Sequence, residues 1–213
     1  MVILLMPIMQ GNGPFLKKIN KFMLIMFRFS LPIIIVLFSA NSLKAQSKEK
    51  IHHYMQTLNN FSSSFIQTEN LSNSEGKIFA NNSRIKIKYS SPSNIVIIIA
   101  KNKGMYFNQD LEEVEFFNPK DSIGKIFYNV FFNQKFLDNA TFVYETSYSI
   151  IKKKISFNNA EYEILLYFEN KPIKIRKIKI IGKDYKVDLG IYNIELNQKL
   201  DAKFFSMISP LIN

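Results

Sequence analysis

Two groups of side chains in this sequence are of types that support acid–base or metal chemistry: the acidic cluster Glu112, Glu113 and Glu115, and the adjacent pair His52 and His53. Carboxylates can act as general acids and bases, and histidine is the commonest metal ligand. The glutamates follow a turn and enter a short strand, where carboxylates usually face solvent. Successive helical residues diverge by about 100°, so the two histidines cannot chelate one ion. We interpret both groups as surface residues.

The other signatures of enzymes are missing from the sequence. There is no cysteine nucleophile, no glycine-rich phosphate loop, no nucleophile elbow and no metal-ligand spacing. We therefore expect a protein that is not an enzyme and that uses neither a metal nor a cofactor. The choice that remains is between a binding protein and a structural protein.

The basic charge of the chain has two parts. Five of its 28 basic residues lie in residues 1–45, where no acidic residue occurs. Residues 46–213 therefore carry 23 basic and 17 acidic residues, which gives a net charge of +6, whereas the whole chain has +11. The remaining lysines are mostly spaced singly along alternating segments such as 152–155 and 174–180. That spacing indicates a solvated sheet face, or weak attraction to anionic lipid headgroups. No nucleic-acid-binding motif accompanies it, and we expect no nucleic-acid partner.

The N-terminal segment has the pattern of a secretory signal. Arg28 ends a basic region, residues 29–38 (FSLPIIIVLF) are apolar, and Ala45 offers a cleavage site before Gln46. The competing interpretation is a membrane anchor, but only fifteen uncharged residues separate Arg28 from Lys44, and a spanning helix needs roughly 20. We expect cleavage near Ala45, export to the periplasm and a single soluble domain over residues 46–213. Without a cysteine, that domain cannot be lipidated after the signal.

The exported part begins with a predicted amphipathic helix and continues as strands. Ile51, Tyr54, Met55 and Leu58 form one helical stripe within residues 47–58. The period then changes to two, most regularly in residues 84–89, where apolar residues take the odd numbers. The predicted strands lie in residues 61–67, 76–79, 84–89, 95–100, 105–107, 114–116, 140–147, 150–157, 162–168, 172–181 and 186–197. Because residues 95–100 are apolar on both faces, we expect that strand to be central and covered on both sides.

A second helix is predicted at residues 122–133, and it is apolar over most of its circumference. Such a helix is either buried or covers an apolar volume. The elements together predict a mainly β protein: an incomplete, half-open antiparallel β-barrel of about ten or eleven strands covered by short α-helices. Periodicity alone leaves two alternatives open, a helix that fills the barrel as ordinary core and a helix that covers a ligand cavity.

Several motifs occur in the order and spacing found in the LolA family of periplasmic lipoprotein carriers, which this sequence resembles over nearly all of residues 47–207. Residues 61–67 (FSSSFIQ) are similar to the family's F-x-A-x-F-x-Q segment. Residues 76–79 (GKIF) and 89–92 (YSSP) are similar to the next two strand motifs. Residues 99–114 (IAKNKGMYFNQDLEEV) are similar to a longer family motif, with one residue fewer.

The resemblance implies an apolar cavity that takes up the acyl chains of lipoproteins. It also implies partners: lipoproteins, an inner-membrane ABC transporter that releases them, and an outer-membrane receptor of the LolB kind. We expect a monomer. Two alternatives remain open: a LolA-fold module that binds or senses a lipid without transferring lipoproteins, and a structural β protein with a filled core.

The candidate site residues follow from this resemblance and from the parity of the strands. The expected cavity wall consists of Ile85, Ile87, Ile97, Ile99, Met105 and Phe107. The expected lid over it consists of Ile123, Ile126, Phe127, Val130 and Phe131. Family members carry an arginine that helps to hold the lid, and here its position is taken by Asn82, with Arg84 two residues further on. We treat Asn82 and Arg84 as candidates for pinning the lid.

Overall fold

The computed structural model describes residues 47–69, 72–81 and 83–211. The expected signal segment and Asn82 lie outside the described residues. From Ser47 onward the chain forms one compact unit. It begins with a helix over residues 47–57, as the stripe of apolar residues predicts.

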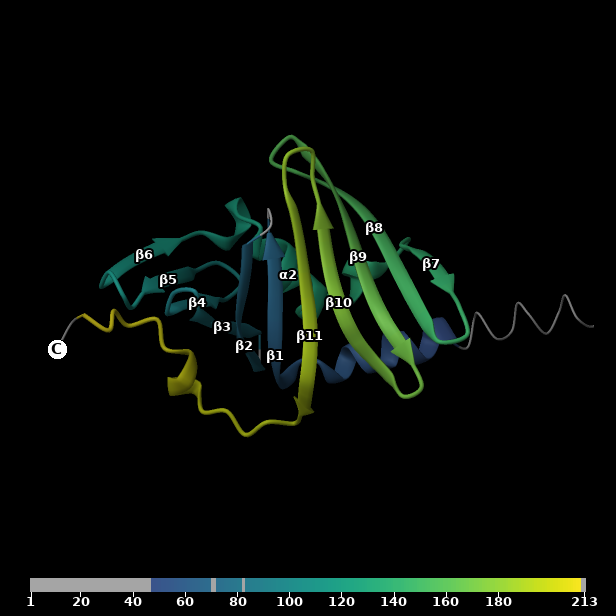
Figure 1. The fold of residues 1–213 in the computed structure, drawn as a ribbon, viewed down its shortest axis with the longest axis horizontal. Helices are drawn as coiled ribbons and strands as arrows, with labels where there is room; N and C mark the ends of the chain where they lie inside the picture. Colours follow the sequence, from purple (N-terminus) through teal and green to yellow (C-terminus); the bar gives the residue numbers. More distant parts are fainter. Residues whose placement is uncertain (1–46, 70–71, 82, 212–213) are drawn as a thin grey trace, which may run out of the picture. The chain divides into compact units, whose positions relative to one another are not determined.

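One antiparallel sheet of eleven strands dominates the structure (Figure 1). Its strands are β1 (Asn60–Glu69), β2 (Ser72–Asn81), β3 (Arg84–Ser91), β4 (Ile95–Ile99), β5 (Gly104–Asn108), β6 (Glu113–Phe117), β7 (Thr141–Tyr144), β8 (Tyr148–Phe157), β9 (Ala160–Asn170), β10 (Ile173–Ile181) and β11 (Lys186–Leu196). The strand order is β6-β5-β4-β3-β2-β1-β11-β10-β9-β8-β7. The chain therefore starts in the centre, runs out to one edge, crosses to the other edge and returns to pair β11 with β1.

The crossing between the two edges contains the second helix. It consists of η1 (Pro119–Asp121), α2 (Gly124–Phe132) and η2 (Gln134–Leu137). Asn118 caps η1 by accepting a hydrogen bond from the Lys120 amide, and Asn133 ends α2 and caps η2 by accepting one from Lys135. The expected fold class is confirmed: an open, mainly β sheet with helices on one face.

The concave face of the sheet carries the main hydrophobic core. Under β8, β9 and β10 this core is filled by the helix 47–57 and the second half of α2, and we call this part the filled half. Its largest buried side chains include Leu58, Phe61, Ile164, Leu166 and Phe168, all at most 1% exposed. The phenyl rings of Phe61 and Phe131 pack 5.2 Å apart, which joins α2 to the centre of the sheet.

The convex face carries a smaller apolar cluster, which explains why β4 is apolar on both sides. Val96, Ile98 and Met105 are buried there, with Phe107, Val114 and Met207 packed around them. The C-terminal segment, which includes η3 (Ala202–Phe205), crosses this face. It is held by hydrogen bonds from Asn81 to the carbonyl of Leu200 (2.8 Å) and from Lys86 to that of Phe204 (2.8 Å).

Candidate functional site

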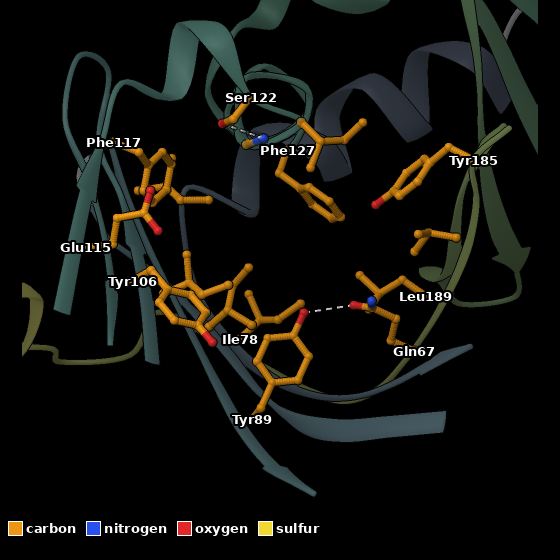
Figure 2. A pocket seen from close by; sticks show the side chains of 16 residues that line it. Gln67, Ile78, Tyr89, Tyr106, Glu115, Phe117, Ser122, Phe127, Tyr185 and Leu189 are labelled. Carbon is orange, nitrogen blue, oxygen red and sulfur yellow. Dashed lines mark hydrogen bonds between the residues drawn. The ribbon is translucent and has the colours of Figure 1, made fainter. Parts of the chain in front are cut away.

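A partly open cavity of about 390 Å³ lies between the concave face of the sheet and the start of α2 (Figure 2). We call the part of the molecule around it the hollow half. The residues that line it are Gln67, Ile78, Ile87, Tyr89, Ile97, Ile99, Tyr106, Glu115, Phe117, Ser122, Ile123, Gly124, Phe127, Tyr185, Val187 and Leu189. The volume falls within the range of about 300–1,000 Å³ typical of small-molecule sites. Its wall is mostly apolar.

The aliphatic wall of the cavity comes from strands that face inward by parity. Residues paired across an antiparallel ladder share a face, and Ile87 pairs with Ile78 on one side and with Ile97 on the other. Leu189 and Val187 of β11 pair with Gln67 and Glu69 of β1, so their side chains lie on the same face of the sheet. These side chains are short and branched, so they cover the sheet without filling the space above it.

Of the six residues expected in the cavity wall, Ile87, Ile97 and Ile99 line it. Ile85 lies on the same face, but it is only 1% exposed and belongs to the packed core. Met105 and Phe107 lie on the opposite, convex face.

The placement of Met105 and Phe107 corrects the expected parity of β5. Ile99 pairs with Gly104 and Ile97 with Tyr106, because four residues, 100–103, connect the two strands. Because the number of connecting residues is even, the inward-facing residues have odd numbers in β4 but even numbers in β5. Tyr106 therefore takes the place in the cavity wall that was expected for its neighbours.

The five expected lid residues divide between two environments. Ile123 and Phe127, at the start of α2, line the cavity and are partly exposed. Ile126, Val130 and Phe131 are at most 5% exposed and pack in the core. Ile123 and Phe127 therefore cover the cavity, whereas Ile126 in the same turn and the second half of the helix pack in the core.

The start of α2 rests closely on the sheet. A Cβ atom added to Gly124 would lie 3.3 Å from the Cδ1 atom of Ile99 and 3.0 Å from the hydroxyl of Ser122. That hydroxyl accepts a hydrogen bond from the Gly124 amide and donates one to the Pro119 carbonyl, each 3.2 Å long. Within the described residues no side chain of α2 forms a hydrogen bond or an ion pair with the sheet. Besides apolar contacts, the ammonium of Lys125 lies 5.3 Å from the ring centroid of Phe157 in β8, and the side chain of Asn158 donates a 3.2 Å hydrogen bond to the carbonyl of Asp121 in η1.

Phe117 reaches the cavity because Gly104 leaves room for it. The two residues pair across β5 and β6, and a Cβ atom on Gly104 would lie 2.3 Å from the ring of Phe117. The ring thus packs on the bare backbone of the neighbouring strand. A side chain at position 104 would displace Phe117 from the cavity wall.

Hydroxyl and amide groups form one end of the cavity. The hydroxyl of Tyr89 donates a 2.8 Å hydrogen bond to Oε1 of Gln67, whose Nε2 donates to Glu69 at 3.2 Å. Burial raises the pKa of Tyr89 to about 12, and the nearby Tyr185 and Glu69 add to the shift. Burial also raises the pKa of Tyr185 to about 12, with the charge of Glu69 acting in the same direction. Both hydroxyls are therefore protonated at neutral pH.

The lid-pinning candidate Arg84 lies on the other face of the sheet. Its guanidinium is 3.5 Å from the carbonyl oxygen of Phe205, to which it donates a hydrogen bond. Even-numbered residues of β3 face outward, as the contact of Lys86 with Phe204 also shows. Arg84 therefore binds the C-terminal segment and does not contact α2.

The acidic cluster and the two histidines lie at the surface, as the sequence predicts. His52, His53, Glu112 and Glu113 are exposed. Glu115 is exposed as well, but it also lines the cavity, which the interpretation as a simple surface residue missed. No group of three metal-binding side chains occurs in the part of the chain that the structure describes. Among the described helices, none is both long and apolar enough to cross a bilayer.

Sequence reasoning missed the contribution of β1, β6 and β11 to the cavity. Gln67 lies at the end of the F-x-x-x-F-x-Q motif and shares its inward parity with Phe65, so the motif contained a usable signal. Tyr185, Val187 and Leu189 gave no such signal. They reach the cavity only because β11 returns to the centre of the sheet.

Comparison with known proteins agrees with this architecture. A sequence model described as "Outer membrane lipoprotein carrier protein LolA" matches residues 56–208. No curated protein sequence matches the chain significantly.

Solved structures with a similar arrangement have very different sequences. An uncharacterized conserved protein from Thermus thermophilus has 7% identity and a TM-score of 0.49, over 78% of this chain and 94% of that one. A putative outer membrane lipoprotein-sorting protein domain from Vibrio parahaemolyticus has 6% identity and a TM-score of 0.44, over 74% and 94%. The Pseudomonas aeruginosa MucA/MucB complex contains a chain with 9% identity and a TM-score of 0.44, over 76% and 60%. Nothing about activity follows from these likenesses.

Proposed function

The chain belongs to the LolA family of outer membrane lipoprotein carrier proteins, and on this premise we propose that it is a periplasmic carrier that holds the acyl chains of lipoproteins in the cavity under α2. The observation that carries the proposal is the partly open, mostly apolar cavity of about 390 Å³ between the sheet and α2. A structural protein of this size would fill such a volume with side chains.

The proposed cargo explains why a cavity is needed. Each methylene group left in water costs about 0.8 kcal/mol, so one sixteen-carbon acyl chain costs roughly 12 kcal/mol. Unassisted passage through the aqueous periplasm would therefore be very slow. A carrier lowers this cost by covering the chain with apolar side chains such as Ile87, Ile97 and Leu189. It must still release the chain to the next acceptor, which a partly open cavity favours.

We propose that the first turn of α2 is the moving part. Ile123 and Phe127 cover the cavity without hydrogen bonds from α2 side chains to the sheet within the described residues. Arg84, the candidate for holding the helix, binds the C-terminal segment instead. The second half of α2 keeps its place through Phe131, whose ring packs on that of Phe61.

The partners that this function requires are an inner-membrane ABC transporter, which supplies the lipoprotein, and an outer-membrane receptor of the LolB kind, which accepts it. The proposed location is the periplasm, after cleavage near Ala45.

A substitution at Phe127 tests the proposal. In Phe127→Asp a carboxylate stands at the apolar wall of the cavity, so we expect release of a lipoprotein from inner-membrane vesicles to be abolished. Because Phe127 is partly exposed, most of the thermal stability should remain. Phe116→Asp is the matched control, since Phe116 is 48% exposed and lies outside the cavity lining. It should leave release nearly unchanged.

Two results would contradict the proposal. Unfolding of Phe127→Asp would show that the first turn of α2 is ordinary core. Full retention of release, with the variant folded, would show that the cavity does not take part in it. If the native protein binds lipid but releases no lipoprotein, the lipid-binding or sensing module becomes the better description.

A further inference from the structure

The lining of the cavity carries a negative charge and no positive charge. Of its sixteen lining residues none is Lys, Arg or His, and Glu115 is the one with a formal charge. The basic side chains of the neighbouring strands face the other way. Lys77 and Lys88 pair with each other on the convex face, and Lys86 on that face contacts Phe204. Among the described residues that line the cavity, none has a cationic side chain that could bind an anionic group.

A second carboxylate acts on the opposite end of the cavity. The charge of Glu69 contributes to the raised pKa of both Tyr89 and Tyr185, so it lies close enough to both hydroxyls for its field to be felt there. Glu69 accepts a hydrogen bond from Gln67, which lines the cavity. Negative charge therefore faces the cavity from β6 through Glu115 and from the end of β1 through Glu69.

The same cavity holds hydrogen-bond donors that are available to a ligand. In Figure 2 the hydroxyl of Tyr185 points into the open space, whereas that of Tyr106, which also lines the cavity, points away from its centre. Neither hydroxyl has a hydrogen-bond partner within the described part of the chain. Both tyrosines are only partly buried, so these hydroxyls can donate hydrogen bonds to a ligand that brings an acceptor.

We infer that the cavity selects acyl chains whose head group is a neutral ester or amide, and that it rejects free fatty acids, whose head group is a carboxylate. The inference rests on the proposed carrier function and adds the chemistry at the head of the chain. An ester or amide carbonyl accepts hydrogen bonds from tyrosine hydroxyls without carrying a charge. A carboxylate would enter a mostly apolar cavity that offers two like charges and no cation, which is unfavourable.

This selectivity would let the carrier distinguish lipoprotein cargo from free fatty acids. Fatty acids are as apolar in their chains as lipoprotein cargo is, so the aliphatic wall alone could not separate them. Separation has to come from the head group, where the difference is one charge.

The experiment measures displacement of the neutral fluorescent probe N-phenyl-1-naphthylamine from the full exported domain near pH 8. The ligands are dodecanoate, its neutral glycerol monoester and a neutral synthetic lipopeptide with an acylated cysteine. We expect both neutral ligands to displace the probe at concentrations about tenfold or more below that of dodecanoate, a difference of about 1.4 kcal/mol. Glu115→Gln should reduce this ratio by strengthening dodecanoate binding. Tyr185→Phe should reduce it by weakening the glycerol ester.

Matched controls separate these effects from general changes. Glu113→Gln changes an exposed carboxylate of the same strand outside the lining, and Tyr192→Phe changes an exposed tyrosine of β11. Neither should alter the ratio.

The outcomes distinguish the inference from the function on which it rests. Equal displacement by dodecanoate and the glycerol ester, or stronger displacement by dodecanoate, overturns the inference and leaves acyl carriage intact. Displacement by the glycerol ester but not by the lipopeptide supports the inference and contradicts lipoprotein carriage. If none of the three ligands binds, both are overturned.

Discussion

The two halves of the concave face are built from the same sheet and covered by the same helix, yet one is packed and the other is open. In the filled half, Phe61, Phe131 and Phe168 lie between the sheet and the helices and are at most 5% exposed. In the hollow half the sheet presents short aliphatic residues such as Ile87 and Val187, and a volume of about 390 Å³ remains above them.

The difference in packing between the two halves explains how a small domain can be stable and still contain a cavity. Large aromatic side chains in the filled half supply dispersion and burial. In the hollow half the aromatic side chains, such as Tyr106, Phe117 and Phe127, stand around the cavity and leave its centre open. The C-terminal half of α2 therefore contributes to stability, and Ile123 and Phe127 at its start contribute to the cavity.

The largest effect is expected from truncation in the filled half. Phe131→Ala removes a ring that packs on Phe61 at 5.2 Å. A buried Phe→Ala change costs about 3–5 kcal/mol, a large part of a typical domain's stability. Denaturant unfolding monitored by circular dichroism measures it. A loss below about 1 kcal/mol would show that the second half of α2 is not core.

A matched pair of substitutions makes the same chemical change in both halves. Leu166→Phe adds volume to a packed site and should lower the free energy of unfolding by about 1–3 kcal/mol. Leu189 is only 3% exposed but borders the cavity, so a phenyl ring there can extend into open volume. Leu189→Phe should therefore destabilise the fold less than Leu166→Phe, while it greatly weakens binding of an acyl ligand. Unfolding curves and probe displacement on both variants decide it. Equal destabilisation by the two would mean that the cavity is not an open volume in solution.

The smallest effect concerns the hydroxyl end of the cavity. Tyr89→Phe removes the hydrogen bond to Gln67 and should lower the free energy of unfolding by about 1 kcal/mol at neutral pH. The pKa of Tyr89 is about 12 in the folded protein, against about 10 in an unfolded chain. Between these values the unfolded chain loses a proton that the folded protein keeps, so stability falls as pH rises.

The Tyr89→Phe variant should therefore lose less stability than the native protein when pH is raised from about 10 to about 12. Unfolding free energies across this window measure the difference. Parallel curves would show that the hydroxyl titrates normally in the folded state.

Much of the fold followed from short-range pattern. The alternation in residues 84–89 predicts β3, and the apolar run at 95–100 predicts a strand covered on both sides, which the C-terminal segment and Met207 provide. These features depend on neighbours in sequence, because a strand's two faces are fixed by residue parity.

The cavity was less predictable, since it depends on connections and on long-range pairing. The four residues 100–103 decide whether Met105 or Tyr106 faces inward. The contribution of Leu189 requires β11 to return beside β1. Helical spacing places Phe127 and Phe131 on one stripe, but it cannot tell which of them meets a filled volume.

The central claim is that the acyl chain of a lipoprotein lies against the first turn of α2. Site-specific photo-crosslinking tests it most directly, with a benzophenone amino acid at position 127 in one variant and at exposed position 192 of the convex face in another. After release of a lipoprotein from inner-membrane vesicles, the account predicts a crosslink to the acylated cysteine's lipid from position 127 and none from position 192. Crosslinks of equal yield from both positions, or from position 192 alone, would contradict it.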